Sequence, residues 1–93
     1  MFIAKDALRS LGEAGFNAPD LRIHMHYVYL IESESTPGKR YVGYSDNLRQ
    51  GVTDHNAGKN VSTAPFRPWR LQTYLAFSTK AQALAFECYL KSG

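Results

Sequence analysis

Four tyrosines lie close together in the sequence, at Tyr27, Tyr29, Tyr41 and Tyr44. Side chains two residues apart on a strand point to the same face, so Tyr27 and Tyr29 would share one face. A phenol with a pKa near 10 is a poor base at neutral pH unless a nearby cation favours the phenolate. The alternative is cross-strand aromatic packing, which is common and stabilising. Both interpretations stay open at this point.

His55 is the second candidate for chemistry. On a helix over residues 46–56, Leu48, Val52 and His55 would form one stripe, with position 51 at its edge. A histidine on such a stripe is either a hydrogen-bonded core residue or an acid–base group. Gly51 is unusual there, because glycine inside a helix costs about 1 kcal/mol relative to alanine. It marks either a close-packing contact or the loss of a larger side chain.

Charge is distributed unevenly along the chain. The net charge is +3, and residues 1–24 carry three cations and three carboxylates, so the excess lies in residues 25–93. Between Asp54 and Glu87 there are four cations and no carboxylate: Lys59, Arg67, Arg70 and Lys80. Such a segment could hold phosphates, or could simply provide solubility. Glu87 itself has a favourable i, i+4 partner in Lys91, as an ordinary surface residue would.

Two predicted strands and a helix must position the tyrosines and His55. Residues 27–31 and 40–44 are rich in aromatic and β-branched residues, and the turn-forming loop between them predicts a hairpin. Ser45 or Asp46 is predicted to cap the following helix, which runs to about Asn56 and stops before Gly58.

The remaining elements complete a β-β-α-β-α order. Residues 70–77 alternate as a third strand, which would place Leu71, Thr73, Leu75 and Phe77 on one face. Ser78 or Thr79 is predicted to cap a last helix that ends at Leu90. A hairpin plus a third strand, covered by helices, is an α+β architecture.

Residues 1–24 form a predicted extension to one domain over residues 25–93. Residues 4–14 have helical periodicity and residues 17–20 form a turn or linker, so this extension is either an extra element or a leader. The 93 residues contain no apolar run long enough for a membrane span. A single cysteine excludes an internal disulfide and any cysteine cluster, so we expect a reducing, cytoplasmic environment.

These blocks together resemble the GIY-YIG nuclease family, including its small stand-alone members and the N-terminal domain of excinuclease UvrC. Tyr27-Val28-Tyr29 is similar to the first motif, and Tyr41-Val42-Gly43 is similar to the second. Leu48, His55 and the Asn56-Ala57-Gly58 stop match the helix after the second motif. Residues 85–91 resemble the segment that carries the family's glutamate. The resemblance covers residues 26–93, with every block in order.

The resemblance implies a three-stranded antiparallel sheet flanked by helices, and hydrolysis of DNA phosphodiester bonds with one Mg²⁺ (or Mn²⁺) ion. It would place Tyr29 and Tyr41 at the scissile phosphate, give His55 a part in proton transfer, and make Glu87 the metal ligand. The residues expected to contact DNA are Tyr44, Lys59, Arg67 and Arg70. Relatives of this type act in DNA repair, in mobile introns and in restriction.

The sequence departs from the family at Gly51, where an arginine is expected one turn before His55. Arg49 cannot replace it, because two residues along a helix are about 160° away around the axis. The chain also stops at Gly93, where relatives usually continue with a short basic tail. We therefore expect an impaired endonuclease. The alternatives are a non-catalytic DNA-binding domain, or an interaction module that forms a homodimer through residues 1–24.

Overall fold

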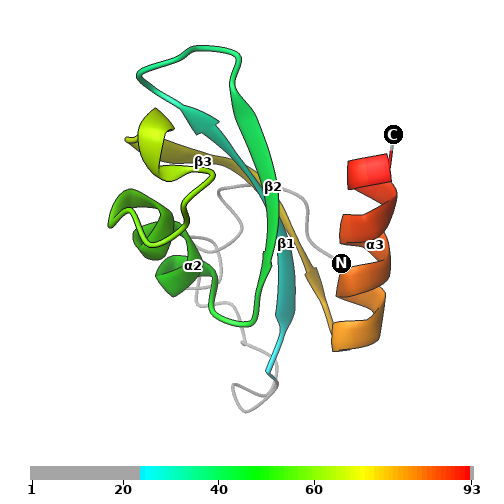
Figure 1. The fold of residues 1–93 in the computed structure, drawn as a ribbon. Coiled ribbons are helices and arrows are strands. Elements are labelled where there is room, and N and C mark those ends of the chain that lie inside the picture. Colours follow the sequence, from blue (N-terminus) through cyan, green and yellow to red (C-terminus); the bar gives the residue numbers. More distant parts are fainter. Residues whose placement is uncertain (1–23, 93) are drawn as a thin grey trace, which may run out of the picture.

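A computed structural model describes residues 24–92, so the helix expected over residues 4–14 lies outside the described part. The elements in chain order are β1 (His26–Ser33), β2 (Arg40–Ser45), α2 (Leu48–Asn56), the short 3₁₀ helix η1 (Ala64–Phe66), β3 (Trp69–Phe77) and α3 (Lys80–Ser92). The strands form an antiparallel sheet in the order β2-β1-β3. The helices α2 and α3 lie on opposite sides of this sheet (Figure 1). The predicted α+β architecture is therefore confirmed.

The main core lies between the sheet and α2. Its buried members are Tyr29, Ile31, Leu48, Trp69 and Tyr74, with Tyr27, Tyr41, Val52, Phe66 and Leu71 packed around them. Alternation along β1 places Tyr27 and Tyr29 together on this face, as predicted. Tyr27 packs edge-to-face on Tyr74 at 5.9 Å between ring centroids. The packing interpretation of the tyrosine cluster therefore holds for Tyr27.

Gly43 makes room for the Tyr29 ring. The two residues are paired across β1 and β2. A Cβ atom built on Gly43 would lie 2.5 Å from the Tyr29 Cζ and hydroxyl oxygen, far inside van der Waals contact. The glycine of the second motif is therefore a steric requirement, since it lets the first-motif tyrosine lie flat across the neighbouring strand.

The face predicted for Leu71 is wrong. We expected it to share a face with Thr73, but the pairing of β1 with β3 shifts register between Leu30 and Ile31. Leu30 pairs with Thr73 and Ile31 pairs with Leu71, which leaves Gln72 as the extra residue of a bulge. The bulge turns Leu71 to the α2 side, where it packs on the core.

The predicted cap of the first helix is also wrong. Asn47 caps α2, because its side-chain oxygen accepts a hydrogen bond from the Gln50 backbone N–H at 3.1 Å. Ser45 is already engaged in a local turn, in which its hydroxyl bonds the backbone N–H and carbonyl of Asn47. The predicted stop is confirmed by Gly58, whose φ of +79° is the left-handed conformation typical after a helix.

The loop between α2 and β3 is fixed by two side chains. Asn56 donates to the backbone carbonyl of Trp69 at 2.9 Å and accepts from the Trp69 backbone N–H. The Trp69 indole N–H donates to the Thr63 carbonyl at 2.9 Å. These bonds hold Thr63 beneath the end of α2, where its side chain is buried.

The other face of the sheet carries α3. Thr79 caps this helix through a 3.2 Å hydrogen bond from the Gln82 backbone N–H, which confirms one of the two predicted caps. Ala83 is fully buried at the contact between α3 and the sheet. Among the residues that the structure describes, no helix is long and apolar enough to cross a membrane.

Replacement of Gly43 by alanine should destabilise the fold, because the new methyl group must displace the buried Tyr29 ring. Forced overpacking of this kind costs about 1–3 kcal/mol. Urea unfolding of Gly43→Ala measures the loss. Gly51→Ala is the matched control: its Cβ meets Ser45 at 3.1 Å, a milder contact that the better helix propensity of alanine offsets. Equal stability of Gly43→Ala and the parent chain would contradict the steric role.

Candidate active site

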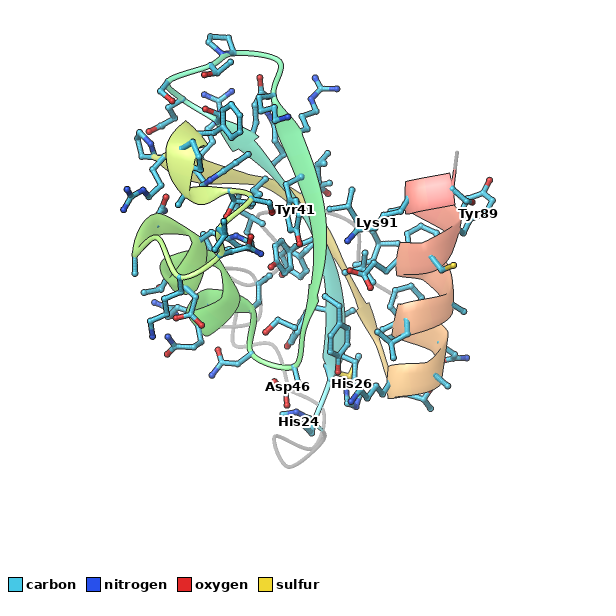
Figure 2. All side chains as sticks on the ribbon, viewed as in Figure 1. His24, His26, Tyr41, Asp46, Tyr89 and Lys91 are labelled. Carbon is cyan, nitrogen blue, oxygen red and sulfur yellow. The ribbon has the colours of Figure 1, made fainter. Side chains whose placement is uncertain are left out.

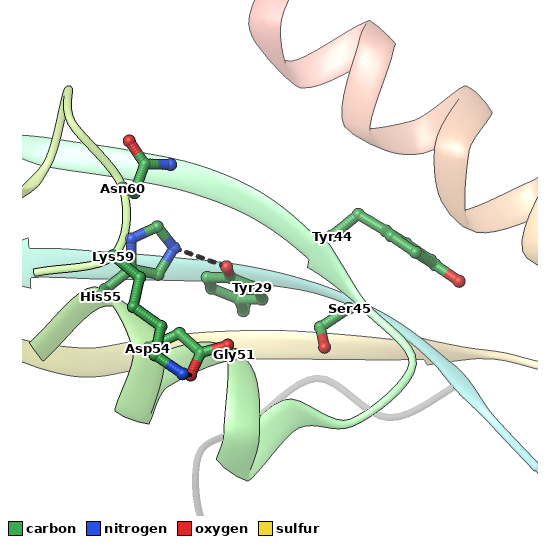
Figure 3. A pocket seen from close by; sticks show the side chains of 8 residues that line it. All are labelled: Tyr29, Tyr44, Ser45, Gly51, Asp54, His55, Lys59 and Asn60. Carbon is green, nitrogen blue, oxygen red and sulfur yellow. Dashed lines mark hydrogen bonds and ion pairs between the residues drawn. The ribbon is translucent and has the colours of Figure 1, made fainter. Parts of the chain in front are cut away.

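A pocket of about 450 Å³ opens where β1, the end of β2 and α2 meet (Figure 3). Its lining residues are Tyr29, Tyr44, Ser45, Gly51, Asp54, His55, Lys59 and Asn60. The pocket therefore gathers Tyr29, Gly51, His55 and Lys59, which the sequence marked for chemistry from separate segments.

A hydrogen bond between Tyr29 and His55 lies at the centre of this pocket. The Tyr29 hydroxyl is 2.7 Å from the His55 Nε2, and the exposed fractions of the two residues are only 4% and 6%. Tyr41 completes the group, since its ring lies 5.0 Å from the His55 ring, edge-to-face. One residue from each of β1, β2 and α2 thus meets at a single point.

The other nitrogen of His55 is bound to a residue that sequence reasoning missed. Its Nδ1 lies 2.8 Å from the Thr63 hydroxyl, and Thr63 is 2% exposed. Thr63 lies in an irregular loop without periodicity, so no sequence pattern marked it as a partner of His55.

Burial keeps both members of the central pair uncharged. The pKa of Tyr29 lies well above its ordinary value, first because the phenol is desolvated and then because Tyr41, Glu87 and Asp54 would repel a phenolate. Burial lowers the pKa of His55, and the neighbouring Asp54 opposes that shift only in part. At neutral pH the site therefore holds a neutral phenol beside a neutral imidazole.

Gly51 faces this pair from α2. A Cβ atom on Gly51 would lie 3.5 Å from the Tyr29 ring and 3.1 Å from the Ser45 Cβ. A larger side chain at this position would thus extend into the pocket beside Tyr29, after a shift of Ser45 by a few tenths of an ångström. Arg49 is exposed and does not line the pocket.

Lys59 brings a cation to the rim of the pocket, but a carboxylate holds it there. Its ammonium lies 3.3 Å from Asp54, which also accepts a 2.8 Å hydrogen bond from Gln50. Lys59 is the single lysine or arginine among the pocket-lining residues. Its side chain is 67% exposed, so it can move toward a ligand at small cost.

Glu87 lies outside this pocket, on the α3 side of the sheet. Its side chain is 20% exposed and pairs with Lys91 at 3.4 Å, so it is more buried than the surface residue that its periodicity suggested. The Lys91 ammonium lies 5.0 Å from the centre of the Tyr41 ring. Figure 2 shows Lys91 extending from α3 toward β2 and Tyr41. Glu87 therefore approaches the tyrosines from the α3 side, and it raises the pKa of Tyr29.

The described residues contain no cluster of three His, Cys, Asp or Glu side chains that could bind a metal ion. The resemblance gives the metal one carboxylate ligand, Glu87. Mg²⁺ is commonly bound by one or two carboxylates, with water and substrate oxygens filling its other positions. Glu87 is thus chemically suited to hold Mg²⁺ together with a phosphate. In this structure Lys91 balances the charge of Glu87.

Two of the residues expected to contact DNA, Tyr44 and Lys59, line the pocket, and Arg67 lies against Gly58, the neighbour of Lys59 in the chain. Tyr44 points away from Tyr29 toward α3 (Figure 3), and its hydroxyl bonds His26 Nδ1 at 2.8 Å. Arg70 lies 3.7 Å from the Glu32 carboxylate, and Arg67 donates to the Ala64 carbonyl at 2.7 Å. Lys59 is the one cation of this set that lines the pocket.

The GIY-YIG catalytic domain model matches residues 25–93 of this chain. The chain belongs to the GIY-YIG family. The match includes every residue that lines the pocket. No solved structure matches the chain significantly.

Relatives of the chain include a homologue of an endonuclease subunit and proteins of the UPF0213 group. A Giardia intestinalis protein named "Structure-specific endonuclease subunit SLX1 homolog" is 35% identical over 65 residues, which are 66% of this chain and 18% of the relative. The chain thus spans less than a fifth of that protein. A UPF0213 protein from Bacillus pumilus is 33% identical over 74% of this chain and 69% of its own length. Another UPF0213 protein, from Haloquadratum walsbyi, is 34% identical over 72% of this chain and 74% of its own length.

The depressed pKa of His55 predicts a pH-dependent stability. The unfolded chain takes up a proton near pH 6.5 and the folded chain only at lower pH, so the contribution of His55 is complete above pH 6.5 and is lost as pH falls below it. We expect the free energy of unfolding to fall between pH 7.0 and 5.5, by up to about 1.4 kcal/mol per pH unit.

The matched control is His55→Gln, which removes the titrating group and keeps a polar side chain. The pKa values of Glu32 and Asp54 are lowered, so these carboxylates titrate below this range. Chemical unfolding at several pH values measures both chains. An equal loss of stability in the two chains would show that His55 is not the group responsible.

Proposed function

We propose that this chain is a DNA endonuclease domain that has the acid–base half of its active site and lacks the cation that completes it. The observation that carries the proposal is the buried Tyr29–His55 hydrogen bond, which faces Gly51 in an open pocket. Family membership and the name of the Giardia relative support phosphodiester hydrolysis as the reaction. DNA is then the partner, and we expect the cytoplasm as its compartment.

Tyr29 and His55 are the residues that would move the proton. Hydrolysis requires water to attack phosphorus in line with the departing oxygen, and the water must lose a proton as the new P–O bond forms. The Tyr29 oxygen would take that proton while its own proton passes to the His55 Nε2. The phenol stays neutral in this relay, which suits a residue whose pKa is far above 7. The imidazolium then returns its proton to solvent or to the departing oxygen.

Glu87 would hold one Mg²⁺ or Mn²⁺ ion in this proposal. When bound, such an ion neutralises charge on the phosphate and on the departing oxygen. Tyr41, between His55 and Lys91, would contact the same phosphate from β2. The Lys91 ammonium lies 5.0 Å from the centre of the Tyr41 ring, so it could leave Glu87 and turn to a phosphate oxygen bound beside Tyr41.

The missing part is a positive charge beside Tyr29. Loss of a phosphate-clamping arginine commonly lowers the rate on the order of 10³–10⁵-fold. Lys59 cannot fully replace it, because a lysine offers a single point charge where an arginine offers a planar, bidentate set of donors, and Asp54 offsets part of that charge. We therefore expect little cleavage by the chain with Gly51, whatever DNA it binds.

A second candidate is a DNA-binding domain without catalysis. The same Gly51 favours it, as does the raised pKa of Tyr29. A role in DNA repair, and a homodimer formed by residues 1–24, stay predictions under either candidate.

Nicking of supercoiled plasmid in Mg²⁺ tests the proposal. The chain and Gly51→Ala should nick slowly or not at all, and Gly51→Arg should be at least about 10³-fold faster. Gly51→Ala is the matched control, since it adds the Cβ atom and the helix propensity without the charge. Tyr29→Phe or Glu87→Gln combined with Gly51→Arg should abolish the gain.

Two outcomes would contradict parts of this proposal. If Gly51→Arg folds and binds plasmid but does not nick it, the domain is a binding module. If Tyr29→Phe leaves the restored activity intact, the proposed proton relay is wrong even though the nuclease assignment stands.

A further inference from the structure

We propose that Thr63 is a positioning residue that holds His55 in the tautomer protonated on Nδ1, and so leaves Nε2 free to accept the proton of Tyr29. The tautomer is a property of the folded chain alone. Its importance for catalysis rests on the proposed nuclease function.

Backbone hydrogen bonds on both sides hold Thr63 in place beside His55. Its backbone carbonyl accepts hydrogen bonds from the Trp69 indole at 2.9 Å and from the Phe66 backbone N–H at 3.1 Å. Its own backbone N–H donates to the Asn60 carbonyl at 3.2 Å. Trp69 is in turn tied to Asn56, the residue directly after His55. The hydroxyl and the imidazole therefore belong to one closed set of contacts.

The direction of the hydrogen bonds follows from counting protons. The Thr63 hydroxyl has one proton, and the Asn60 carbonyl lies 3.4 Å away as a weak acceptor that also receives the Thr63 and Ala64 backbone N–H groups. Donation to Asn60 leaves the Thr63 oxygen as an acceptor for an N–H on His55 Nδ1 at 2.8 Å. His55 Nε2 is then unprotonated and accepts from Tyr29 at 2.7 Å. All three protons have acceptors.

The opposite tautomer leaves one proton without an acceptor. If Nε2 carried the proton, it would donate to the Tyr29 oxygen, and Thr63 would donate to Nδ1. The Tyr29 proton would then have no acceptor among the described residues, and Tyr29 as a whole is only 4% exposed, so only the pocket that it lines would be open to that proton. An unmade bond at a buried hydroxyl is unfavourable. The partner on one ring nitrogen commonly sets the role of the other.

The tautomer decides whether His55 can act as a base toward Tyr29. Only the tautomer with its proton on Nδ1 presents a lone pair to Tyr29, so the same imidazole in the other tautomer cannot accept a proton there. Thr63 is neutral, so it orients the ring without the charge that a carboxylate would bring. That agrees with a histidine whose pKa is lowered by burial.

Nitrogen-15 NMR of the histidine rings tests the tautomer directly, with the whole chain and without DNA. His55 should show a protonated Nδ1 and an unprotonated Nε2 at pH 7.5, and the exposed His24 serves as an internal reference. Thr63→Ser keeps the hydroxyl and should keep this pattern. Thr63→Val is nearly isosteric, and should shift His55 toward the Nε2-protonated form or a mixture of both forms. A protonated Nε2 in the parent chain, or an unchanged pattern in Thr63→Val, would overturn the proposal.

Activity provides the second measurement, in the Gly51→Arg background. Thr63→Val should lower kcat about 10–100-fold with KM little changed, as loss of a residue that orients an active-site histidine does elsewhere. Thr63→Ser should recover most of the loss. If Thr63→Val folds poorly, Thr63→Ala makes the same comparison. A tautomer that shifts while Gly51→Arg remains inactive would uphold the positioning role and reject the nuclease function, so the two failures are distinguishable.

Discussion

The hydrogen bond between Tyr29 and His55 is the interaction on which the rest of the site depends. It joins the central strand to α2 across the main core, and it requires several features at once. Gly43 must lack a side chain for the Tyr29 ring to lie over β2. Leu48 and Val52 must pack on the sheet for His55 to face inward. Thr63 must be held under the helix for the imidazole to have its second partner.

Burial of this pair favours one kind of acid–base chemistry and disfavours another. Desolvation holds a neutral phenol against a neutral imidazole, which is a suitable arrangement for relaying a proton and a poor one for forming a phenolate. A cation beside Tyr29 would favour the phenolate. The backbone of α2 brings position 51 next to the Tyr29 ring, where a side chain could supply that cation. With glycine there, the nearest candidate, Lys59, is paired with Asp54. Under the proposed nuclease function, the fold thus retains the geometry of the proton relay and lacks the cation beside it.

Sequence reasoning worked where a local pattern is enough. Strand and helix periodicity located the hairpin and the α2 stripe with His55, with Gly51 at its edge. It failed where strand pairing or a loop decides the outcome. The bulge at Gln72 reversed Leu71, the turn of Ser45 moved the helix cap to Asn47, and no periodicity linked Thr63 to His55. The pairing of Arg70 with Glu32 likewise depends on a tertiary contact, between β3 and β1.

The most direct test of this account is the titration of Tyr29 itself. Carbon-13 labelling of the tyrosine Cζ atoms would follow each of the six phenols by NMR. In the parent chain Tyr29 should stay protonated well above pH 10, the ordinary pKa of tyrosine. In Gly51→Arg its pKa should fall, and in Gly51→Ala it should not. An ordinary pKa for Tyr29 in the parent chain, or no change with arginine at position 51, would contradict the account.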